Sequence, residues 1–126
     1  MHADDRARAL VATLQAAVDG NDHEALVACF APDPVLAGTT AYVAGADGVR
    51  RYLAAVAQPS NRLHWDLEQY DVYLDQPGLI GFGAVGHVEW DDGEDSGRSR
   101  FRLTIVAQDL GEGWRVLHFH GSVPDA

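Results

Sequence analysis

Two histidines, His118 and His120, stand two positions apart near the C-terminal end of the sequence. On a β-strand this spacing turns both side chains to the same side, and paired imidazoles of this kind are typical zinc ligands. The local sequence offers no third ligand, so a metal site would need His64, His87 or Glu89 from neighbouring strands. We favour the simpler interpretation, in which both histidines form hydrogen bonds within a sheet or a dimer interface. We therefore expect no metal and no cofactor.

Arg100 and Arg102 share the side of a strand that the histidines occupy. Either their guanidinium groups orient the carboxylate of a substrate, because arginine binds carboxylates in a fixed fork geometry, or they pair with Asp66 and Glu89 across strands. We favour the pairing. The acidic run at residues 91–95 offers oxygens that suit calcium, but it lacks the ligand spacing of an EF-hand loop. We predict that this run is a hairpin tip in solvent.

The sequence contains few residues that are well placed for acid–base catalysis. An enzyme of that kind needs a carboxylate or an imidazole inside its pocket, with a pKa tuned by burial. Asp33 is the best-placed candidate, and Asp66 or His64 reaches a pocket only if its strand has another register. The second-choice polar site comprises Asp33, His64, Arg102, His118 and His120.

Aromatic side chains form the first-choice site. Alternation places five of them on the apolar face of a predicted sheet, and two tyrosines approach from the helical side. Aromatic residues usually fill a core, but a pocket lined by aromatics with a few hydroxyl groups binds small apolar molecules. The expected lining residues are Tyr42, Tyr52, Trp65, Tyr70, Trp90, Phe101 and Phe119, with Thr39 and Thr40 near the rim.

The first half of the chain shows the i, i+3, i+4 spacing of amphipathic helices. This spacing predicts one helix from about Asp4 to Val18, a short second helix that reaches Phe30 before Pro32, and a third helix around residues 49–56. A brief extended piece, residues 35–43, joins the second helix to the third.

From Arg62 onward the hydrophobic period changes to two. Four long strands are predicted, at about 62–75, 79–91, 98–108 and 113–122. Short links join them, so neighbouring strands must be antiparallel. Helices followed by such a meander give an α+β domain.

The apolar side chains of the first long strand change parity between Leu67 and Tyr70. Since a slip of one residue reverses every later side chain, we predict a β-bulge at Glu68–Gln69 that bends the strand. In the last strand, alternation turns Leu117 and Phe119 toward the helices. The opposite face is expected to carry Trp114, Val116, His118 and His120.

The composition restricts the function classes. With 19 acidic and 9 basic side chains the formal net charge is −10, which opposes binding to nucleic acid and to anionic membranes. No apolar run has the roughly 18 residues of a membrane helix, and the acidic segment Met1–Asp5 is unlike a secretory signal. Cys29 is the only cysteine, so no intrachain disulfide forms. We expect a single cytoplasmic domain over residues 1–126.

The closing segment Gly113–Pro124, with the sequence GWRVLHFHGSVP, resembles the last strand of nuclear transport factor 2-like proteins. It is most similar to the SnoaL-like branch and to the calcium/calmodulin-dependent kinase association domain. Residues 22–26, 45–53 and 102–106 resemble the family's second helix, third helix and third long strand. The resemblance implies a cystatin-like cone, in which three N-terminal helices pack in a strongly curved antiparallel sheet. It also implies a cavity at the wide end and a homodimer through the sheet faces.

Members of this family include isomerases, cyclases, hydrolases, dehydratases and non-catalytic association domains, so the fold alone does not fix the function. Our leading hypothesis is a protein that binds a small apolar molecule in an aromatic-lined cavity, either without turnover or with a cofactor-independent acid–base isomerisation or cyclisation. The alternative hypothesis is a non-catalytic association module that forms oligomers.

Overall fold

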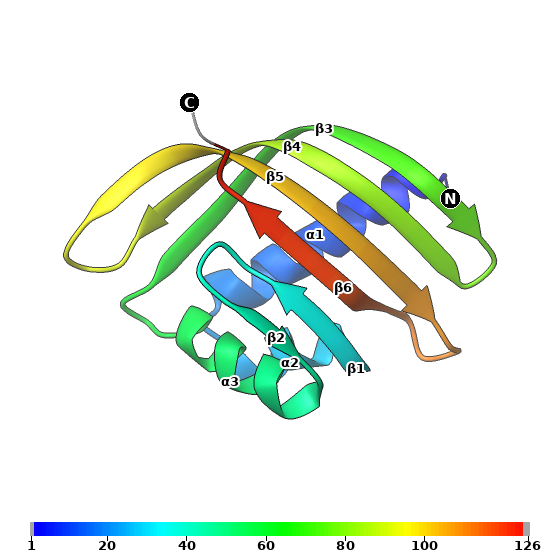
Figure 1. The fold of residues 1–126 in the computed structure, drawn as a ribbon, viewed down its shortest axis with the longest axis horizontal. Helices are drawn as coiled ribbons and strands as arrows, with labels where there is room; N and C mark the ends of the chain where they lie inside the picture. Colours follow the sequence, from blue (N-terminus) through cyan, green and yellow to red (C-terminus); the bar gives the residue numbers. More distant parts are fainter. Residues whose placement is uncertain (1, 125–126) are drawn as a thin grey trace.

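The computed structural model describes residues 2–124, which form three α-helices and six β-strands (Figure 1). The helices are α1 (Ala3–Asp19), α2 (His23–Ala28) and α3 (Ala46–Val56). The strands are β1 (Phe30–Ala37), β2 (Tyr42–Ala44), β3 (Arg62–Gln76), β4 (Leu79–Asp91), β5 (Ser96–Asp109) and β6 (Trp114–Ser122). The α+β class predicted from the sequence is confirmed.

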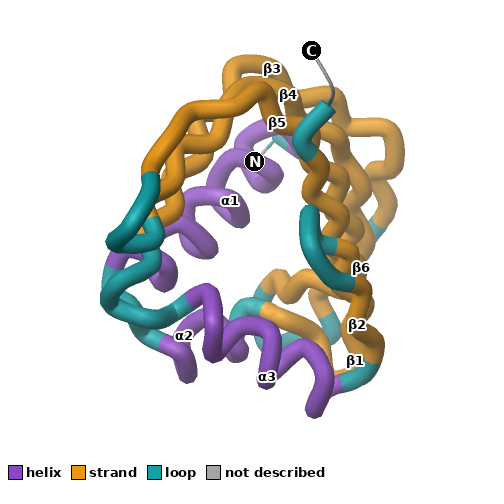
Figure 2. Tube along the Cα trace, turned by 60° about the vertical axis from the view of Figure 1, so that its left-hand side comes forward, coloured by secondary structure: helices purple, strands orange, loops and turns teal. Residues whose placement is uncertain are grey.

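The strands form one sheet in the order β2-β1-β6-β5-β4-β3. Strands β3 to β6 are an antiparallel meander, as predicted. The expected antiparallel sheet needs one correction, because β1 runs parallel to β6. The sheet curves around α1, and α2 and α3 lie beside β1 and β2 (Figure 2). We call the face toward the helices the inner face and the opposite face the outer face.

The segment between α2 and α3 departs most from the sequence-based prediction. Phe30 begins β1 rather than continuing a helix, and Cys29 is the C-cap of α2. Pro32 and Pro34 lie within β1, where the pairing with β6 is interrupted between Phe30 and Val35. Proline has no backbone N–H to donate to a neighbouring strand, so such an irregular stretch tolerates it.

Helix α1 packs an apolar side against the inner face, with Leu10 and Leu14 buried. Gln15 also binds the open edge of β3. Its Nε2 donates a hydrogen bond to the carbonyl oxygen of Leu63 at 2.8 Å, and its Oε1 accepts one from the N–H of Trp65 at 2.9 Å. Since β3 is the last strand of the sheet, this side chain satisfies backbone groups that no further strand pairs.

Register shifts bend the meander at three places in the described chain. The predicted β-bulge is confirmed at Glu68, where the pairing of β3 with β4 slips by one residue. Gly86 lies opposite the bulge, and a Cβ at this position would overlap the backbone of Asp66. The other two shifts, at Tyr73 and Leu117, were not predicted.

The shift at Leu117 corrects the predicted faces of β6. Leu117 has no partner residue in β5, and Val116 takes its place in the core. Trp114 also lies on the inner face, where the guanidinium carbon of Arg6 is 5.7 Å from the ring centre. We expected Val116 and Trp114 on the outer face, because simple alternation does not reveal an inserted residue.

The core between the helices and the sheet is apolar. Among residues 2–124, no polar or charged side chain is fully buried. Within the same part of the chain, no helix combines the length and the apolar character that crossing a bilayer requires.

Candidate functional site

A cavity of about 430 Å³ opens between the C-terminal half of α1, helix α3 and the inner face of the sheet. This volume lies within the range of small-molecule sites. Aliphatic side chains such as Leu14 and Leu36 form part of its wall. Six aromatic residues also line it, namely Phe30, Tyr52, Trp65, Trp90, Phe101 and Phe119.

Three of these rings lie against glycines. The pairs are Tyr52 with Gly38, Trp90 with Gly97, and Phe101 with Gly121. A Cβ at position 121 would lie 2.7 Å from the Phe101 ring, which is closer than real Cβ atoms approach. The absence of a side chain therefore lets each ring lie close to the backbone, and this keeps the centre of the cavity open.

Polar groups are few in the lining of the cavity, which includes Tyr52, Thr39, Thr40, Asn61 and Asp92. Asp92 is solvent-exposed and lies at the mouth, at the start of the hairpin between β4 and β5. Its Oδ1 accepts hydrogen bonds from the backbone N–H groups of Asp95 at 2.8 Å and of Glu94 at 3.0 Å. These two N–H groups lower the pKa of Asp92, so the carboxylate stays ionised and is a weak base.

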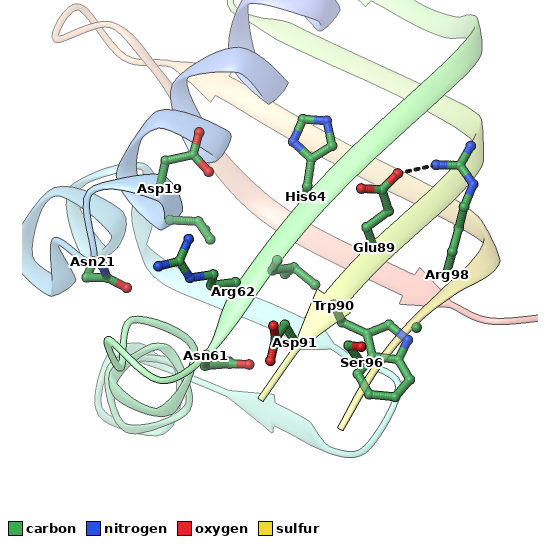
Figure 3. Close-up of a pocket in the computed structure, with 13 residues that line it drawn as sticks. Asp19, Asn21, Asn61, Arg62, His64, Glu89, Trp90, Asp91, Ser96 and Arg98 are labelled. Carbon is green, nitrogen blue, oxygen red and sulfur yellow. Dashed lines mark hydrogen bonds and ion pairs between the residues drawn. The ribbon is translucent and has the colours of Figure 1, made fainter. Parts of the chain in front are cut away.

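A second hollow, which we call the groove, lies beside the cavity and is open to solvent. Its volume is about 790 Å³, and it is formed by the C-terminal end of α1, the start of β3, the end of β4 and the start of β5 (Figure 3). The groove is polar, with Asp19, Asn21, Arg62, His64, Glu89, Asp91, Ser96 and Arg98 in its lining. The residues that line both hollows are Val18, Asn61, Leu63 and Trp90.

Arg98 connects two carboxylates beside the groove. Its guanidinium binds Glu89 (Figure 3) and donates a second hydrogen bond to Oδ2 of Asp66 at 3.1 Å. The hydrogen bond to Asp66, supported by Glu89, raises the pKa of Arg98, which therefore remains charged. We had assigned these two carboxylates to Arg100 and Arg102. The structure corrects this, because Glu89 lies directly opposite Arg98 in the sheet.

Helices enclosed by one strongly curved sheet, with a cavity between them, agree with the resemblance seen in the sequence. A family model described as the SnoaL-like domain matches residues 7–126. The chain belongs to the SnoaL-like domain family. No curated protein matches it.

Solved structures that resemble this SnoaL-like domain have varied names, and some of them are named as nuclear transport factor 2-like proteins. A candidate dehydratase from Streptomyces avermitilis has a TM-score of 0.84 at 14% identity, covering 97% of this chain and 96% of that one. A candidate aromatic ring hydroxylase from Novosphingobium aromaticivorans has a TM-score of 0.78 at 16% identity, covering 94% and 87%. A candidate calcium/calmodulin-dependent protein kinase II association domain from Xanthomonas campestris has a TM-score of 0.76 at 18% identity, covering 94% and 86%. At these identities the likeness shows the fold alone.

Five of the seven aromatic residues expected in the pocket of the SnoaL-like domain line the cavity, and two do not. Tyr42 is 70% exposed on the short edge strand β2. Tyr70 lies beyond the β-bulge, where its ring packs 6.0 Å from that of Phe82 and 4.4 Å from the guanidinium carbon of Arg8 on α1. Helix α1 covers this end of the sheet, so Tyr70 belongs to the packed part of the domain. Burial raises the pKa of Tyr70, and the charge of Arg8 partly opposes that effect.

The second-choice polar residues lie outside the cavity of the SnoaL-like domain and do not come together. Asp33 is exposed on β1, and His64 lines the groove. Arg102 lines another hollow, on the outer face. His118 and His120 flank the inward-facing Phe119 and point to the outer face, opposite Val106 and Thr104 of β5. Within residues 2–124, no group of three or more His, Cys, Asp or Glu residues suits a metal ion.

Asn61 and Asp92 line the cavity, although neither residue was predicted there from the sequence. A signal for Asp92 was present: Trp90 faces inward, so the residue two positions later continues on that side as the strand ends. We had placed Asp92 in a solvated hairpin tip, which is correct for its exposure but overlooks the cavity beside it. Asn61 precedes β3 and follows no periodic pattern, so its place required the structure.

Proposed function

We propose that this SnoaL-like domain binds a small, largely apolar molecule in the cavity between α1, α3 and the sheet. The observation that carries the proposal is the wall itself: aromatic and aliphatic groups surround about 430 Å³. Removing an apolar ligand from water into such a site is favourable by roughly 25 cal/mol for each Å² buried. The few polar groups then fix the orientation of the ligand.

Binding without turnover fits the lining better than isomerisation or cyclisation. General acid–base catalysis needs a group that exchanges protons near neutral pH within reach of the ligand. In the part of the chain that the structure describes, Asp92 is the only carboxylate in the lining, and no histidine lines the cavity. Since its pKa is lowered, Asp92 is poorly suited to accept a proton from a carbon or hydroxyl group.

Tryptophan fluorescence tests the proposal, because Trp65 and Trp90 line the cavity and Trp114 does not. Titration with uncharged aromatic and alicyclic molecules is expected to change the emission with a saturable profile. The variant Trp114→Phe retains the response, whereas Trp65→Phe and Trp90→Phe each reduce it. Native mass spectrometry of the protein as purified adds a direct search for a bound molecule. An absence of saturable binding across the panel, in protein that is folded by circular dichroism, contradicts the proposal.

A second candidate function is association through the outer face of the sheet. Val85 on β4 is 42% exposed at this face. Its partners in the neighbouring strands are Arg102 on β5 and Gln69 on β3. The same face also carries the partly exposed side chains of Thr104, Val106 and His118. A face with apolar residues among polar ones is typical of subunit interfaces, and we propose a homodimer formed through it. Such a dimer leaves the cavity on the inner face free, so both functions are compatible.

A further inference from the structure

The charged group in the described lining of the cavity is negative. Among residues 2–124, Asp92 is the only charged residue in the lining, and no lysine, arginine or histidine of this part of the chain lines the cavity. The nearby arginines Arg62 and Arg98 line the groove instead, and Arg98 is already bound by two carboxylates. From the described lining, a ligand in the cavity therefore meets the ionised carboxylate of Asp92 and no cationic side chain.

The carboxylate of Asp92 is held in place by its own hairpin. The backbone N–H groups of Glu94 and Asp95 both donate to its Oδ1, and the N–H of Asp92 donates to the carbonyl oxygen of Asp95 at 3.0 Å. A fixed negative charge attracts a cation without the entropy cost of ordering a flexible side chain.

Two further properties of the domain favour a cation. Aromatic rings attract cations through their electron-rich faces, and those of tryptophan do so most strongly. Trp65 and Trp90 both present rings to the cavity. The net charge of −10 also raises the local concentration of positively charged ligands around the whole molecule. A carboxylate ligand would instead be repelled by Asp92, by the electron-rich faces of the rings and by the net negative charge.

We propose that the ligand of this cavity is a small apolar or aromatic amine, with its apolar body against the aromatic wall and its ammonium group at the mouth beside Asp92. This inference rests on the proposed binding function and names the chemical class of its ligand. It also accounts for the absence of a cationic side chain from the lining.

Three probes with one apolar body test the inference: naphthylmethylamine, naphthylmethanol and naphthoate. Affinities are measured by calorimetry at low and at high salt. We expect the amine to bind about two- to fivefold more tightly than the alcohol, as is usual for a charge pair open to solvent, and naphthoate to bind most weakly. Raised ionic strength shrinks the difference between amine and alcohol, because salt screens exposed charges.

The variant Asp92→Asn removes the charge but keeps an oxygen that accepts the hairpin N–H groups. It is expected to bind the amine no better than the alcohol, with the affinity for the alcohol unchanged. Asp91→Asn is the matched control, since Asp91 begins the same hairpin, accepts a hydrogen bond from Gly93 at 2.9 Å and lines only the groove. This control keeps the preference for the amine.

Equal binding of amine and alcohol by the wild-type protein overturns the inference and leaves the binding function standing. A preference for the amine that survives in Asp92→Asn also overturns it, because the selectivity then has another source. If none of the three probes binds, both the inference and the proposed function fail.

Discussion

At the scale of single residues, three glycines determine how much of the cavity the aromatic rings leave open. Gly38, Gly97 and Gly121 each allow an aromatic ring to lie close to the backbone. None of the three has a positive φ, so the side chain that they lack matters here, not an unusual backbone conformation. A methyl group at one of these positions must push its ring, and the space available to the ring is the cavity.

The substitution Gly121→Ala is expected to move Phe101 into the cavity, because the new Cβ would lie 2.7 Å from Cζ of that ring. The affinity for an apolar ligand should fall by about 1 kcal/mol or more, the usual cost of a methyl-sized mismatch in a hydrophobic pocket. Calorimetric titration measures the change. Gly83→Ala is the control, since a Cβ there is 3.7 Å from its nearest neighbour, the carbonyl oxygen of Leu103. Unchanged ligand affinity in folded Gly121→Ala would show that the ring moves elsewhere.

Helix α1 has two structural roles at the scale of secondary-structure elements. Its buried side completes the core, and Gln15 closes the edge of β3 with hydrogen bonds to Leu63 and Trp65. Both of these β3 residues line the cavity. The contact of Gln15 with the β3 edge therefore also positions one wall of the site.

Replacement of Gln15 by alanine should lower the free energy of unfolding by about 1–3 kcal/mol, since it leaves two partly buried backbone groups without a partner. Urea unfolding followed by circular dichroism gives the value. Thr13→Ala on the same helix removes only an exposed hydrogen bond to the carbonyl oxygen of Ala9, and it should change the stability by less than about 0.5 kcal/mol. Equal stabilities for the two variants would contradict a role for Gln15 at the strand edge.

The meander was predictable from the sequence because apolar and polar side chains alternate over long stretches of each strand, even though β3 and β6 are interrupted by register shifts. The bulge at Glu68 was predictable for the same reason: the apolar set resumes in opposite parity after it. Leu117 gave no such signal, because Val116 and Leu117 are both apolar and either suits the core. Phe30 was misassigned because helical spacing continues up to it, whereas pairing with β6 decides its conformation. Alternation placed Trp65, Trp90, Phe101 and Phe119 on the inner face, where they line the cavity. The place of Tyr70 was not predictable in this way, because it depends on how far α1 covers the sheet.

At the scale of the whole molecule, the helices pack on the inner face of the sheet and leave the outer face uncovered. No helix covers the outer face in the described structure, and its exposed groups are of mixed polarity around Val85. A homodimer through this face would place the two cavities on opposite sides of the assembly.

Light scattering coupled to size-exclusion chromatography is expected to give the mass of a dimer. Val85→Asp should shift the mass toward that of a monomer, because it places like charges against each other at the interface. Leu110→Asp is the control: Leu110 is 76% exposed at the tip of the hairpin between β5 and β6, away from that face. A wild-type monomer, or a dimer unaffected by Val85→Asp, would exclude this mode of association.

The parallel pairing of β1 with β6 has a consequence for the order of events during synthesis. β1 is made well before β6, which is the last of the described strands, yet Phe30 and Leu36 face the cavity together with Phe119 and Gly121. A nascent chain still lacking its final strand has no complete chamber, whatever secondary structure it has already formed. A ligand in the cavity would therefore stabilise the domain only after β6 has been synthesised and has paired with β1.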